Sequence, residues 1–144
     1  MSFARIARSS ALPVLVLAVG LSAGAEGWDQ QRAIELSSQL EETFDLVVQS
    51  AETAARQQTV MQQRTRDAAL SEFKHVRDIS RDYAAKIREG WGREDSEPFF
   101  SQLRQATRRA REIARDAVPV PKVAVLLERV DSLLLQLSKQ YESA

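Results

Sequence analysis

The chain of 144 residues contains no cysteine and a single histidine, His75. The lack of cysteine excludes disulfides, thiolate metal ligands, thiol nucleophiles and covalently attached haem. Glycine and proline are also scarce, with five and four residues, and neither occurs in residues 28–89. The protein must therefore be stable through its hydrophobic core, and it has few of the side chains on which metal or covalent catalysis depends.

The N-terminal residues follow a distinct order of charge and hydropathy. Arg5 and Arg8 precede an apolar run at residues 11–21, and small residues (Ser-Ala-Gly-Ala) follow it. This order is typical of a secretory signal peptide, and the small residues place the cleavage after Ala25. The sequence therefore predicts a signal peptide at residues 1–25, followed by one domain.

The apolar run is too short to serve as a membrane anchor. A spanning helix needs about 20 apolar residues, whereas Pro13 and Gly20 interrupt this run. There is also no cysteine to carry a lipid at the cleavage site. We expect residues 26–144 to be released into the periplasm as a single helical-bundle domain, without stable membrane insertion. Secretion outside the cell and an uncleaved N-terminal anchor are the alternatives.

Charge is unevenly distributed along the predicted mature chain. Residues 26–53 hold seven acidic residues against one basic residue, which gives −6. Residues 54–93 hold nine basic residues against five acidic ones, which gives +4. Because opposite charges attract, this asymmetry favours antiparallel pairing of the two segments if they pack side by side; binding of a charged partner is the alternative explanation. The mature chain as a whole has 18 basic and 20 acidic residues, a net charge of −2 that does not indicate nucleic-acid binding.

Apolar residues recur every three or four positions, which is the period of an amphipathic helix. Two breaks interrupt this pattern, at Gly90-Trp91-Gly92 and at Val118-Pro119-Val120-Pro121, and Pro121 suits the first turn of a new helix. No segment shows the alternation of a strand. We predict an all-α, up-down four-helix bundle whose core faces are formed by Ala33, Leu36, Leu40, Phe44, Val47, Ala51, Ala54, Ala69, Phe73, Val76, Ile79, Tyr83, Ile87, Phe99, Phe100, Leu103, Ala106, Ala110, Ile113, Ala117, Val120, Val123, Leu127, Val130, Leu134, Leu137 and Tyr141.

The boundary between the first two helices is the least sharply marked. Their apolar stripes lie in nearly the same helical phase, as they would on one continuous helix over residues 28–89. However, the stripe becomes polar at Gln58, Gln62 and Thr65. A turn near residues 57–63 explains this loss and gives four helices of similar length. The alternative is a long helical hairpin with the continuous helix, which would have to dimerise to cover its apolar face.

Five residues form the candidate interaction surface. Arg104, Arg108, Arg111 and Arg115 recur at steps of four, three and four residues, so they form one ridge along a helix. Such a ridge can meet an acidic partner, phosphate groups or a polyanion, although a solvated helix face shows the same pattern. Trp91 lies between two glycines, where an aromatic side chain can anchor a partner or fold back to cap the bundle.

Glu72 and His75 form a Glu-x-x-His step, which is similar to the step that ferritin-like di-iron bundles use. Those sites need a second such step, and the sequence has no second histidine. Met61 and His75 would stand about 21 Å apart on one helix, which prevents joint haem ligation. No phosphate-binding loop or nucleophile motif is present. We therefore expect no metal site, no cofactor and no enzymatic activity.

Two function classes remain. The protein can bind another protein through a helical surface, or it can hold a small ligand in the interior of the bundle. Periplasmic stress chaperones that form cradle-like α-hairpin dimers are similar to this chain in size, export and helicity, but their Leu-Thr-x-x-Gln signature is absent from it. We expect a soluble periplasmic protein-interaction module (adaptor, inhibitor or chaperone-like), monomeric or homodimeric, with an unidentified envelope protein as partner. The alternative is a small-ligand or cofactor-binding four-helix bundle, because alanine-rich helix faces leave room for a ligand.

Overall fold

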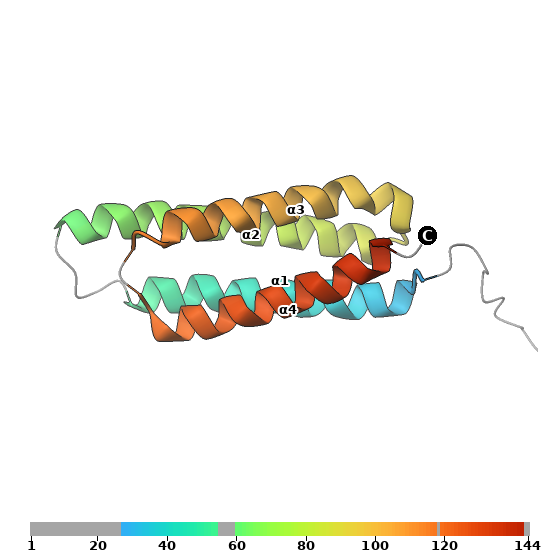
Figure 1. Cartoon of the computed structure of the whole chain (residues 1–144), viewed down its shortest axis with the longest axis horizontal. Helices are drawn as coiled ribbons and strands as arrows, with labels where there is room; N and C mark the ends of the chain where they lie inside the picture. Colours follow the sequence, from blue (N-terminus) through green and yellow to red (C-terminus); the bar gives the residue numbers. More distant parts are fainter. Residues whose placement is uncertain (1–26, 55–59, 118, 143–144) are drawn as a thin grey trace, which may run out of the picture.

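The computed structural model describes residues 27–54, 60–117 and 119–142. These residues form four helices, α1 (Gln30–Thr53), α2 (Val60–Arg88), α3 (Arg93–Ala114) and α4 (Pro121–Glu142), which lie alongside one another as a bundle (Figure 1). No strand occurs in these ranges, so the predicted all-α class with four helices is confirmed. The predicted signal peptide and its cleavage site lie outside the described residues.

Local sequence signals account for several helix ends. Asp29 caps α1, because its carboxylate accepts a hydrogen bond of 3.0 Å from the backbone N–H of Arg32. After α2, Gly90 turns the chain with a φ of 99°, in the left-handed region that glycine adopts without strain. Pro121 is the first residue of α4, where its missing N–H costs nothing.

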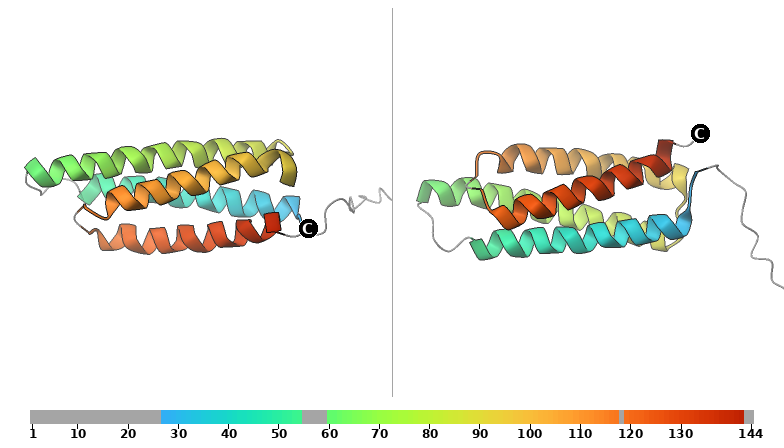
Figure 2. Two further views of the ribbon diagram at one scale, coloured as in Figure 1. Left: turned by 45° about the horizontal axis from the view of Figure 1, so that its top comes forward. Right: turned by 60° about the horizontal axis from the view of Figure 1, so that its bottom comes forward.

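The four helices do not contact one another equally. α1 packs against α2 and α4, α2 also packs against α3, and the contact between α3 and α4 is the least extensive of these. Figure 2 shows that α4 is inclined to α1 and approaches α3 towards its own C-terminal end. The α3–α4 side is therefore the most open side of the bundle.

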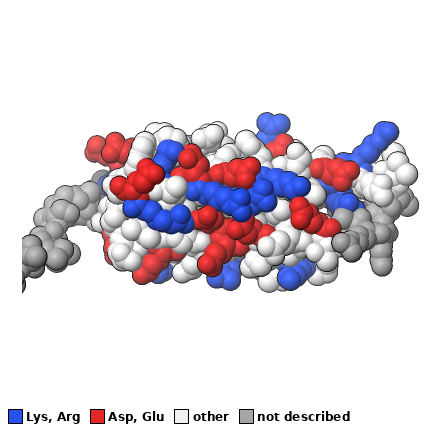
Figure 3. All heavy atoms as spheres, turned by 180° about the vertical axis from the view of Figure 1, so that it is seen from behind, with Lys and Arg blue, Asp and Glu red and all other residues white. Residues whose placement is uncertain are grey.

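Acidic side chains of α1 meet basic side chains of α2 across the seam between the two helices. The ion pairs are Asp45–Arg81 at 2.7 Å, Glu52–Lys74 at 3.3 Å, and Glu41–Arg88. Figure 3 views the molecule from behind Figure 1 and shows basic and acidic groups interleaved along this face. Each pair is partly exposed and contributes at most about 1 kcal/mol. The expected antiparallel pairing of the acidic and basic segments is confirmed.

The pairing of α1 with α2 also decides between the two sequence-based architectures. Because these helices lie against each other, the alternative of one continuous helix over residues 28–89 is wrong. The sequence predicts a turn near residues 57–63, but residues 60–63 belong to α2. Residues 55–59 lie outside the described residues.

Most residues of the predicted stripes on all four helices form the core. Eight of the predicted residues are only partly buried and pack against it: Ile79, Phe99, Ala106, Ile113, Ala117, Val120, Leu127 and Leu134. Burying each large apolar side chain stabilises the fold by about 1.5–3 kcal/mol. The largest side chains that are almost completely buried are Tyr83, Phe44, Leu36, Leu40, Ile87, Leu103, Leu137, Val47, Val76 and Val130.

No described helix combines the length and apolar character that a membrane span requires.

A cluster of aromatic rings and hydroxyl groups closes one end of the bundle. The hydroxyl oxygen of Tyr141 lies 2.7 Å from that of Tyr83 and 2.8 Å from Oγ of Ser96. The Tyr141 ring stacks on Phe100 at a centroid distance of 4.6 Å and packs against Trp28 at 5.1 Å. Burial raises the pKa of both tyrosines. This tyrosine network joins α2, α3 and α4.

Candidate functional site

A groove between α3 and α4 contains most of the predicted arginine ridge. The two helices are joined at one end by Ser96 and Tyr141, 2.8 Å apart, and towards the other end by Arg111 and Leu127. Between these two links lies a groove of about 310 Å³. It is lined by Arg104, Thr107, Arg108 and Arg111 of α3 and by Asp131, Leu134, Leu135 and Ser138 of α4.

Arg104 and Arg108 are the exposed cations of the groove. The guanidinium carbon of Arg104 lies 5.8 Å from the ring centroid of Phe100, a cation–π distance. Leu135 lines the opposite wall and is 60% exposed. The groove therefore offers two positive charges beside an accessible apolar side chain.

Arg111 has a different role from the one that the ridge predicts. Its Nη2 donates to the backbone carbonyl of Leu127 at 2.6 Å and lies 2.7 Å from Oδ2 of Asp131. The side chain is therefore directed across to α4 rather than along a solvated face. Arg111 holds α3 to α4 at one end of the groove.

We expect Arg111→Ala to lower the free energy of unfolding by about 1–2 kcal/mol, because hydrogen bonds from a charged donor are stronger than neutral ones. Asp131→Asn is the matched control, since it keeps the bond from Arg111 to the Leu127 carbonyl and weakens only a half-exposed ion pair. Urea unfolding of both variants measures the difference. Equal losses would mean that the ion pair, and not the carbonyl bond, makes the link.

Two members of the predicted surface lie elsewhere. Arg115 is exposed and follows the last residue of α3, where its backbone N–H donates to the carbonyl of Arg111 at 3.0 Å. Trp91 is half-buried at the turn between α2 and α3, with its ring edge-on to Phe99 at 5.4 Å and Lys86 Nζ 5.5 Å from its centroid. Trp91 thus packs onto the bundle end, as the capping alternative expects.

The α4 wall of the groove was not found from the sequence. The predicted apolar stripe of residues 120–141 includes Leu134 but neither Leu135 nor Asp131. The run of three leucines at residues 133–135 was the available signal, because consecutive positions on a helix are about 100° apart and cannot all face the core. Which of them borders a groove depends on where α3 lies.

The Glu-x-x-His step lies on another side of the molecule. His75 is exposed, and Oε1 of the half-buried Glu72 lies 3.6 Å from Nε of Arg109. Within the described ranges, no group of three or more histidine, aspartate or glutamate side chains is placed to hold a metal ion. The groove between α3 and α4 is therefore the site whose chemistry the structure defines best.

Comparisons with protein-family models, with curated proteins and with solved structures found no match to this chain.

Proposed function

We propose that this chain is an exported, non-enzymatic protein of the periplasm that binds an envelope protein through the groove between α3 and α4. The export rests on the order of charge, apolar run and small residues in residues 1–25. The fold in this proposal is an up-down four-helix bundle, which acts as a monomer or a homodimer. Secretion outside the cell is the alternative destination.

The observation that supports an interaction role is the composition of the groove. Arg104 and Arg108 are exposed on one wall and Leu135 on the other. Arginine is enriched at protein interfaces, and arranged charges select complementary partners. A partner that covers Leu135 would also remove exposed apolar surface from water. The groove therefore suits an acidic segment that also carries an apolar side chain. Nucleic acid is a poor match, because the predicted mature chain has a net charge of −2.

Site-directed photo-crosslinking in cells tests this proposal. A crosslinking side chain in place of Leu135 is expected to capture one envelope protein, because position 135 faces the groove. The matched control is position 46 on α1, where Leu46 is also an exposed leucine, 39% accessible. Capture of the same protein from both positions, or from neither, would contradict binding in the groove.

Charge reversal measures the contribution of the arginines. We expect Arg104→Glu combined with Arg108→Glu to weaken binding of the purified partner by about tenfold or more, with a smaller salt dependence of the association rate. The control is Arg64→Glu combined with Arg129→Glu, which changes the net charge equally at two exposed positions that do not line the groove. Equal effects of the two double variants would show that only net charge matters and would exclude a site-specific contact.

A further inference from the structure

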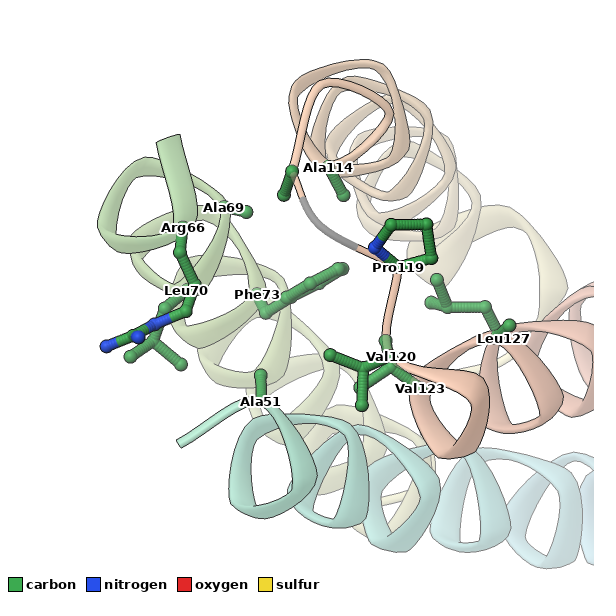
Figure 4. Close-up of a pocket in the computed structure, with 12 residues that line it drawn as sticks. Ala51, Arg66, Ala69, Leu70, Phe73, Ala114, Pro119, Val120, Val123 and Leu127 are labelled. Carbon is green, nitrogen blue, oxygen red and sulfur yellow. The ribbon is translucent and has the colours of Figure 1, made fainter. Parts of the chain in front are cut away.

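An apolar cavity lies at the opposite end of the bundle from the tyrosine network. It is partly open to solvent, and its volume is about 150 Å³. Figure 4 shows the Phe73 side chain reaching from α2 toward Pro119, with Val120 and Ala51 on the other sides of the same space. The lining residues are Ala51, Arg66, Ala69, Leu70, Phe73, Ala114, Ala117, Pro119, Val120, Val123, Ala124 and Leu127.

The cavity exists because small side chains and a forced break in the helices meet there. Five alanines, at positions 51, 69, 114, 117 and 124, line it from α1, α2, the end of α3, the residues that follow α3, and α4. Pro119 and Pro121 prevent α3 from continuing into α4, and Pro119 and Val120 line the cavity on the α4 side of this break. The alanine-rich faces of the sequence therefore leave a space at this end.

The lining chemistry defines what the cavity can hold. Every lining residue except Arg66 is apolar, and the nitrogen atoms of Arg66 point away from the space between Phe73 and Val120 (Figure 4). A cationic ligand would lose its hydration without gaining an acidic partner among the described lining residues, and an anionic ligand would have only Arg66, whose nitrogen atoms are directed away. An enclosed apolar cavity of about this volume in another protein binds benzene or xenon. The present cavity has the same apolar character but is partly open to solvent, so a small molecule can enter it directly.

We propose that this cavity binds one small uncharged apolar molecule, the size of a single aromatic ring or a short hydrocarbon chain. Such a molecule would restore the dispersion contacts that the lining atoms lack. The site is separate from the groove between α3 and α4. It gives the small-ligand alternative of the sequence a defined location, and it does not depend on the proposed protein interaction.

Benzene and xenon are the probes for the test on the purified protein. At a benzene concentration about ten times the dissociation constant, we expect the melting temperature to rise by about 3–6 °C, because only the folded state binds. Xenon should produce a saturable chemical-shift change in its own NMR signal. Absence of both effects would overturn the proposal, since it would show that the cavity is closed in solution.

Variants distinguish binding in the cavity from a general solvent effect. Ala114→Leu places three more carbon atoms in the cavity and should abolish both the benzene and the xenon responses. The matched control is Ala68→Leu, the same substitution at an exposed position that does not line the cavity, which should keep both responses. If Ala114→Leu does not fold, Ala117→Leu fills the same space from a half-buried position. Responses that persist in the filled variant would refute the cavity as the binding site.

Discussion

Phe100→Ala is expected to lower the free energy of unfolding by about 3–5 kcal/mol, the usual cost of truncating a buried phenylalanine. Phe100 is 3% exposed and lies between two tyrosine rings. Its centroid is 4.6 Å from that of Tyr141 and 5.9 Å from that of Tyr83. Truncation would therefore leave a cavity beside both rings and remove two aromatic contacts. Urea unfolding followed by circular dichroism measures the loss.

The neighbouring phenylalanine provides a matched control. Phe99 is half-buried, and its ring contacts Trp91 and the ammonium group of Lys86 at the bundle end. We expect Phe99→Ala to cost about 1–2 kcal/mol, because less apolar surface returns to water and little cavity remains. If both variants lost the same free energy of unfolding, Phe100 beside the tyrosine network would be no better packed than Phe99 beside Trp91.

Tyr141→Phe is expected to lower the free energy of unfolding by about 1–3 kcal/mol. The substitution keeps the ring but leaves the hydroxyl of Tyr83, a residue that is 1% exposed, without the partner that now lies at 2.7 Å. Oγ of Ser96 keeps its own bond to the carbonyl of Gly92 at 2.7 Å. The cost should therefore come mainly from Tyr83.

A double-mutant cycle checks the source of that cost. Tyr83→Phe combined with Tyr141→Phe removes both hydroxyl groups, so no buried hydroxyl is left unpaired between the two rings. We expect the double variant to lose clearly less stability than the sum of the single variants. Additive losses would mean that the two hydroxyls are not coupled.

The same network predicts a loss of stability at alkaline pH. Burial raises the pKa of Tyr83 and Tyr141 above the ordinary value of about 10. Below that pH both tyrosines are protonated in the folded and unfolded states, and their stabilising effect is fully present. Above it the unfolded state releases protons that the folded state retains, so the free energy of unfolding falls by up to about 1.4 kcal/mol per pH unit for each tyrosine.

Near-ultraviolet absorbance tests this pH dependence directly, because Tyr83 and Tyr141 are the two tyrosines of the sequence. Tyrosinate absorbance should remain low above pH 10 while the protein is folded and rise together with unfolding. The doubly substituted variant should lose stability less steeply over the same range. Tyrosinate that forms near its ordinary pKa in folded protein would contradict the buried network.

The approximate residue ranges of the helices, and the face of each helix that is buried, can be predicted from the sequence. Leu36, Leu40 and Phe44 fall on one side of α1 whatever that helix packs against, because the helical period sets the direction of every side chain. The acidic and basic segments likewise predicted the seam between α1 and α2, since charge attraction acts regardless of side-chain detail. Arg104 and Arg108 are exposed, because the same helical period places them opposite the apolar stripe of α3.

The groove, the cavity and the tyrosine network depend on contacts between residues far apart in the chain. Arg111 shares its ridge with Arg108, and only the position of α4 brings the Leu127 carbonyl within reach of its guanidinium group. The hydroxyls of Tyr83 and Tyr141 are 58 residues apart in sequence and 2.7 Å apart in space. Periodicity defines which face of a helix is apolar, but the packing of side chains between helices decides which helices meet, how closely, and where space is left between them.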